Sequence, residues 1–116
     1  MRLTPDACAA VYECLRQLSP FKGWKLPSSD EVEFAVTKDK KHFGTHTHYI
    51  GTDEHIIEIS EENNGHFNTL ATTMAHEMIH MHQRRTKRVT KAQHNPDFKR
   101  RAKLVCKELG WDAKAF

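Results

Sequence analysis

Apolar residues recur with helical spacing at both ends of this chain and with strand spacing in the middle, so their pattern divides the sequence into elements. Over residues 5–18 the spacing predicts an amphipathic helix that ends before Pro20, where a helix cannot continue. The apolar stripe of this helix comprises Ala7, Ala10, Val11, Cys14, Leu15 and Leu18. Residues 20–30 are rich in proline, glycine and serine and predict a loop, from which Phe21 and Trp24 pack onto the core.

The middle of the chain predicts a small sheet. Residues 31–38 alternate between apolar and polar side chains, as a strand does when only one of its faces is buried. Residues 47–51 and 55–60 form two further short strands, and the turn residues between them indicate a hairpin. We therefore expect a small three-stranded antiparallel sheet.

Two more helices follow the sheet. The first covers residues 67–83, with Asn68 as a suitable N-cap. Its apolar positions recur at spacings of four, four and three residues, at Leu70, Met74, Met78 and Met81. A basic loop over residues 84–95 leads to a last helix over residues 96–109, which Gly110 ends. The order helix, sheet, helix, helix predicts an α+β fold in which the 67–83 helix packs on the sheet.

Length and composition favour one small domain over residues 1–116. Apolar residues make up only 38% of the chain, so a bound metal that ties two helices together would help to stabilise the fold. No apolar run approaches the roughly 18 residues of a membrane span, and the N-terminus does not read as a secretory signal. Cys8, Cys14 and Cys106 have no metal-binding spacing and are expected to be buried, reduced thiols. These features together predict a cytoplasmic location, in the organism itself or in a host cell.

Residues 76–80 read HEMIH, which matches the motif H-E-x-x-H within the 67–83 helix. Histidines four residues apart lie on one helix face, so His76 and His80 can both reach one Zn²⁺ ion at roughly 2.0–2.1 Å. Glu77 is then placed to act on a water molecule bound to that ion. The motif points to metal-assisted hydrolysis, most often of a peptide bond, against the simpler interpretation of a surface helix that carries histidines.

A catalytic zinc ion needs a third protein ligand. The longer motif that ends in a third histidine six residues after the second fails here, because Thr86 occupies that position. Glu108 has a suitable side chain but stands at the end of its helix. His94 is the better candidate, because it directly precedes a helix that Asn95 can cap and is therefore held at a fixed point.

The motif HEMIH, followed by a basic loop and then by HNPDF at residues 94–98, resembles the SprT-like zinc metallopeptidases, a family that includes the Spartan-type proteases that digest proteins crosslinked to DNA. Members usually carry glycine where this chain has Asn95. The resemblance implies a compact zincin-like domain with one Zn²⁺ ion held by His76, His80 and His94. The four-cysteine zinc ribbon of many members is not present, which suggests the protease core alone.

Positive charge is concentrated in the last third of the chain. Residues 1–83 contain seven Lys and Arg against twelve Asp and Glu, whereas residues 84–116 contain eleven against three. This density allows either a solvated face or a surface that binds nucleic-acid phosphates without reading sequence. The residues proposed for phosphate contact are Arg84, Arg85, Lys87, Arg88, Lys91, Lys99, Arg100 and Lys103.

These observations give one main hypothesis and three alternatives. The main hypothesis is a zinc-dependent metallopeptidase that acts on a protein or peptide, including proteins associated with DNA, in which Glu77 accepts a proton from zinc-bound water. The first alternative is a nucleic-acid-binding module with a non-catalytic zinc site. The others are a hydrolase that acts on a non-peptide amide and a protein inhibitor or scaffold that retains zinc without turnover. Tyr49, His48 or an arginine of the basic loop is expected to stabilise the oxyanion, and the sequence does not choose among them.

The remaining histidines carry no strong motif. His46 and His48 have a spacing that can hold a metal, but no third ligand is evident, so we interpret them as surface histidines or as histidines at the rim of the site. His82 is expected to point away from the metal-binding face into solvent. His55 belongs to no motif.

Overall fold

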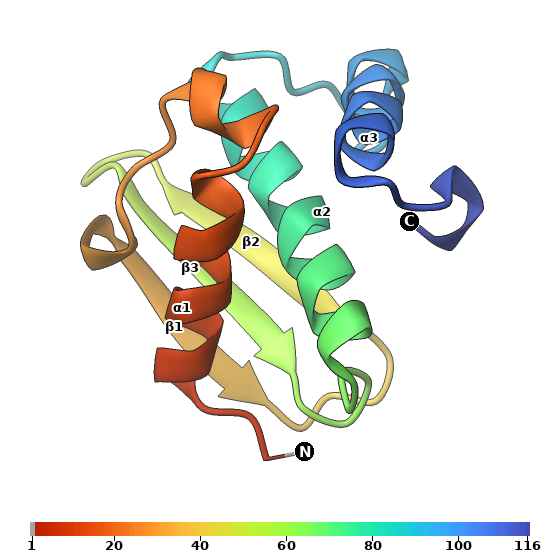
Figure 1. The fold of residues 1–116 in the computed structure, drawn as a ribbon. Helices are drawn as coiled ribbons and strands as arrows, with labels where there is room; N and C mark the ends of the chain where they lie inside the picture. Colours follow the sequence, from red (N-terminus) through yellow and green to blue (C-terminus); the bar gives the residue numbers. More distant parts are fainter. Residues whose placement is uncertain (1) are drawn as a thin grey trace.

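The computed structural model describes residues 2–116 and contains three helices and three strands. The elements in chain order are α1 (Pro5–Arg16), β1 (Val32–Thr37), β2 (Gly44–Tyr49), β3 (Glu54–Ser60), α2 (Phe67–Arg85) and α3 (Pro96–Leu109). Helices α1 and α2 lie side by side on one face of the sheet, and α3 packs against α2 (Figure 1). The predicted α+β fold and its order of elements are confirmed.

The sheet is mixed, so the prediction of a purely antiparallel sheet was wrong. Its strand order is β1-β3-β2, with β1 parallel and β2 antiparallel to β3. Strand β3 takes the central position, and its Ile57 and Ile59 are fully buried. Alternation identifies the buried face of a strand but does not fix the direction of its neighbour.

The predicted hairpin between β2 and β3 is present, but β2 begins three residues earlier than expected. The sequence analysis missed this earlier start because the first residues of the strand are polar. Gly44 permits this strand to pass close to α2, because a Cβ atom at position 44 would lie 2.9 Å from Cγ2 of Thr73. Strand β2 thus runs along the helix that carries the HEMIH motif (Figure 1).

Helix α2 forms the centre of the core. Its apolar side chains Leu70, Met74, Met78, Ile79 and Met81 are almost or completely inaccessible to solvent. The helix starts at residue 67 as expected and ends two residues later than expected, but His66 rather than Asn68 is its N-cap. Asn64 fixes this end, because its buried amide donates to the carbonyl oxygens of Phe43 and Ser60 and accepts a hydrogen bond from Thr73.

The predicted apolar stripe of α1 is only partly buried. Helix α1 ends at Arg16, and Val11 and Leu15 are buried, whereas Ala7, Ala10 and Cys14 are exposed. Cys8 and Cys106 are buried as expected. Leu18 lies beyond the helix and is exposed. Within residues 2–116, no helix combines the length and apolar character that a membrane crossing requires.

Candidate metal centre

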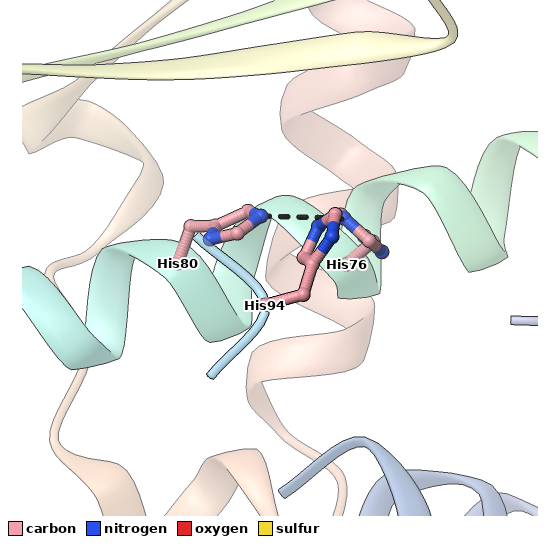
Figure 2. Close-up of side chains that lie close together, drawn as sticks. All are labelled: His76, His80 and His94. Atoms are coloured by element: carbon pink, nitrogen blue, oxygen red, sulfur yellow. Dashed lines mark hydrogen bonds between the residues drawn. The ribbon is translucent and has the colours of Figure 1, made fainter. Parts of the chain in front are cut away.

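Three histidine rings converge between α2 and the segment that precedes α3 (Figure 2). Nε2 of His76 lies 3.2 Å from Nε2 of His80 and 3.1 Å from Nε2 of His94. His76 and His80 come from successive turns of α2, and His94 approaches from the loop at the other side. The structure therefore brings together the three residues that the sequence suggested as ligands.

The separations between the ring nitrogens suit a tetrahedral metal ion. Two ligand nitrogens bound to one Zn²⁺ at roughly 2.0–2.1 Å and a tetrahedral angle lie about 3.3 Å apart. The shortest separations in the cluster are within a few tenths of an ångström of this value. A set of three imidazoles is also a ligand set that zinc commonly uses in sites with one open coordination position. The residues present therefore fit a zinc ion.

The electrostatic environment keeps the ligand nitrogens available. Burial, with a smaller contribution from the neighbouring histidines, lowers the pKa of His76 and of His80 to about 4. Neutral imidazole is the form that binds a metal, so neither ring has to lose a proton at neutral pH.

Phe98 packs against all three histidine rings. Its ring, carried by α3 and almost fully buried, has its centroid 4.9 Å from that of His76, 4.6 Å from His80 and 4.7 Å from His94. An apolar ring in contact with all three imidazoles restricts their rotation and excludes water from one side of the cluster. The sequence analysis gave Phe98 no role beside the three histidines.

A hydrogen-bond network around Asn95 fixes the position of His94. The Asn95 side-chain oxygen accepts from the backbone N–H of Phe98 and so caps α3. The same oxygen accepts from the amide of Gln83 on α2, 3.0 Å away, and the Asn95 amide donates to the carbonyl oxygen of Arg88. The asparagine thus ties α2, the basic loop and α3 together beside the ligand. Sequence reasoning identified the cap but missed Gln83.

Glu77 lies next to His76 in an unusual environment for a carboxyl group. It is only 6% exposed, and burial raises its pKa to about 7. Among the described residues it forms no ion pair. Together with His76 it lines a pocket of about 570 Å³. The other walls come from the first half of α2, from the start of β2 with the residues before it, and from Phe116.

The SprT-like family model matches residues 11–114 of the chain, which include the HEMIH motif, His94 and all three helices except the start of α1. The chain belongs to the SprT-like family. This confirms the resemblance noted in the sequence. No curated protein matches the chain significantly.

Two histidines of this SprT-like protein lie where the sequence did not place them. His82, predicted to be solvated, is 7% exposed and stacks on Trp24 with ring centroids 4.3 Å apart. Burial lowers its pKa to about 4. The prediction was wrong because the loop after α1 covers this side of α2, and Arg101 closes over the same indole ring. His55 is also buried, on the central strand.

The side chains proposed to stabilise the oxyanion lie in different environments. Tyr49 is half exposed near the end of β2, and His48 on the same strand is hydrogen-bonded to Asp53. Arg84 at the end of α2 is exposed. His46, whose pKa burial lowers to about 3, lies on β2 opposite buried Ile57 and faces the helix layer. No contact singles out one of these side chains.

The basic residues of the SprT-like protein form an exposed surface next to the cluster. Arg84 and Arg85 end α2, and three more lie in the loop that leads to His94. Lys99, Arg100 and Lys103 are exposed on α3. Arg100 pairs with Asp97, whereas the others form no ion pair among the described residues. The full exposed set is Arg84, Arg85, Lys87, Arg88, Lys91, Lys99, Arg100 and Lys103.

Replacing His94 by alanine should remove one zinc equivalent from the protein, because two remaining imidazoles bind a metal more weakly than three. Zinc content after dialysis, measured by atomic emission, tests this. His66→Ala is the matched control, since His66 is exposed and makes no capping hydrogen bond. Equal zinc content in the His94 variant and the wild type would contradict the assignment.

Glu77 should make the metal-free protein less stable as the pH rises. Its pKa of about 7 in the folded state lies above the ordinary value of 4.5, so the stability that the neutral carboxyl group contributes is present below pH 4.5 and is lost as the pH rises through 7. Glu77→Gln removes this loss. From pH 5 to pH 8 the difference in the free energy of unfolding between the variant and the wild type should change by about 2 kcal/mol in favour of the variant.

Urea unfolding in the presence of a chelator measures this difference. Histidines titrate in both proteins and cancel in the comparison. Glu62→Gln, at an exposed glutamate, is the control and should show no such change with pH. A constant difference between Glu77→Gln and the wild type over this range would show that Glu77 ionises normally.

Proposed function

We propose that this SprT-like protein is a zinc-dependent metallopeptidase that hydrolyses peptide bonds. The observation that carries the proposal is the convergence of three imidazole nitrogens beside a buried glutamate at the wall of a pocket. A site that served only to stabilise the fold would not require a carboxyl group at that position, and burying one is unfavourable. This argues against the alternative of a non-catalytic zinc site.

His76, His80 and His94 would hold the zinc ion. Bound there, zinc would polarise the carbonyl group of the substrate and lower the pKa of water from about 15.7 toward 7. Glu77 in its ionised form accepts a proton from the attacking water and returns it to the departing amine. Its pKa of about 7 before metal binding suits a group that must both take up and release a proton near neutral pH.

The substrate is proposed to lie along β2. This strand is at the edge of the sheet, so one side of its backbone is not paired with another strand. The pocket is lined both by Gly44, where β2 starts, and by Glu77. An extended peptide that adds to a free strand edge forms backbone hydrogen bonds that do not depend on its sequence. This mode favours unfolded or flexible protein segments as substrates.

Glu77→Gln should retain zinc and lose proteolysis. The amide occupies almost the same volume as the carboxyl group but cannot accept the proton, so the rate should fall by about 10²–10⁴-fold. Cleavage of an unfolded protein such as casein, followed by gel electrophoresis together with zinc analysis, provides the measurement. Glu62→Gln should remain fully active. Undiminished cleavage by Glu77→Gln would remove Glu77 from the mechanism.

We also propose that the basic surface binds nucleic acid and brings the protease to proteins associated with DNA. The surface runs from the end of α2 through the loop to His94, and so adjoins the proposed active site. Exposed cations without acidic partners attract phosphate groups through release of counterions, independently of base sequence. Aromatic side chains for base stacking are scarce there, since Phe98 is buried beneath the histidines.

Arg88→Gln combined with Lys91→Gln should weaken DNA binding and lower its dependence on salt. Each lost phosphate contact reduces the slope of log K against log salt by about 0.7–0.9. Fluorescence anisotropy with a labelled oligonucleotide at several salt concentrations measures both quantities. Lys38→Gln combined with Lys40→Gln removes the same charge from exposed positions in the segment between β1 and β2 and should have little effect. Equal losses in the two double variants would mean that only net charge matters.

A further inference from the structure

A second group of metal-binding side chains lies on the hairpin of β2 and β3. His48 of β2 and His55 of β3 are opposite each other in the antiparallel register, and their rings stack with centroids 4.3 Å apart. Asp53, in the turn that joins the strands, places Oδ1 2.7 Å from Nε2 of His48 and 4.0 Å from Nε2 of His55. The ligand atoms of the three residues all lie within 4.8 Å of one another.

His55 supplies an independent indication of a missing ligand. Its side chain is 2% exposed, and its Nε2 atom has no hydrogen-bond partner among the described residues. A buried polar atom in a folded protein normally has a partner. The carboxylate of Asp53 lies 4.0 Å away, which is too far for a hydrogen bond. A cation between the two atoms would satisfy both.

The other nitrogen of His55 is already engaged. Nδ1 of His55 lies 2.9 Å from Nε2 of His46, which stands two residues before His48 on β2. When His55 donates from Nδ1, its Nε2 atom carries the lone pair that a metal requires. Histidine ligands of metals usually donate their second N–H to such a partner. Burial also lowers the pKa of His55 to about 4, so its ring is neutral at physiological pH.

We infer that His48, Asp53 and His55 form a second binding site, for a divalent transition-metal ion and most favourably Zn²⁺. Two imidazoles and a carboxylate are a ligand set that zinc accepts, with the fourth position left for water. The present separation between His48 and Asp53 is shorter than the roughly 3.3 Å expected for two ligands of one zinc ion. Asp53 is 74% exposed in its side chain and has room to adjust, and a metal ion would take the place of its direct contact with His48.

A metal ion at this site would join both strands and their turn. It would hold β2, the edge strand beside α2, in its register against β3 without taking part in the proposed hydrolysis. Zinc should therefore raise the thermal stability of a protein in which the first site has been removed, because a ligand that binds only the folded state shifts unfolding to higher temperature.

The test is the zinc stoichiometry of the full chain, measured by calorimetric titration with zinc chloride and by atomic emission after dialysis. The wild type should bind two equivalents, and Asp53→Asn and His94→Ala should each bind one. Asparagine suits position 53, because this exposed turn residue has a φ of 56° and asparagine tolerates the left-handed conformation. The double variant should bind none, and zinc should not raise its melting temperature.

Two further variants keep the result decisive. His48→Phe retains a ring to stack on His55 and removes the ligand nitrogen, so it should also lose one equivalent even if the amide at position 53 still binds weakly. Asp39→Asn is the control, because Asp39 forms a comparable pair with His42 but has no third ligand among the described residues. It should retain two equivalents.

The outcomes separate this site from the first one. A wild type with one equivalent that neither Asp53→Asn nor His48→Phe reduces would overturn the second site and leave the first intact. A wild type with one equivalent that both variants abolish, and that His94→Ala retains, would support the second site and reject the metal centre of the proposed function.

Discussion

The hydrogen bond between Gln83 and Asn95 is the interaction on which the candidate metal centre depends. His76 and His80 are fixed by the helix that carries them. His94 belongs to a loop, which by itself does not fix the position of this residue in space. Asn95 removes this freedom, because its side chain caps α3, accepts from Gln83 on α2 and donates to the loop carbonyl of Arg88. Each contact alone is worth about 1 kcal/mol, and together they specify one position for the neighbouring residue.

This network also explains the departure from the usual family pattern. Glycine at position 95 would leave the backbone free, whereas asparagine adds a cap at the start of α3 and two contacts to surrounding elements. Asp97 extends the same connection, because it accepts from Gln83 and Arg101 and lies in the first turn of α3, where a negative charge is favourable. The end of the loop is therefore tied to both helices at Asn95, whereas the basic residues of the loop are exposed.

Local patterns in the sequence predicted much of this site, and long-range contacts account for what they missed. The HEMIH motif needs only the period of a helix, and the position of His94 followed from a cap and a proline at the start of α3. The direction of β1 relative to β3 could not be predicted, since alternation is the same in parallel and antiparallel pairs. His82 was misplaced for a related reason, because its burial depends on Trp24, 58 residues away in the chain.

The two histidine clusters differ in the elements that hold them, and this difference predicts how each responds to a metal. The first cluster lies on a long buried helix and a capped helix start, and its ring nitrogens already have the separations that a tetrahedral ion requires. The second depends on Asp53 in an exposed turn, so one ligand must move as the metal binds. A preorganised site loses less conformational entropy on binding and should therefore fill at the lower zinc concentration. Partial occupancy would thus leave the site beside Glu77 loaded while the hairpin site remains in exchange with solvent.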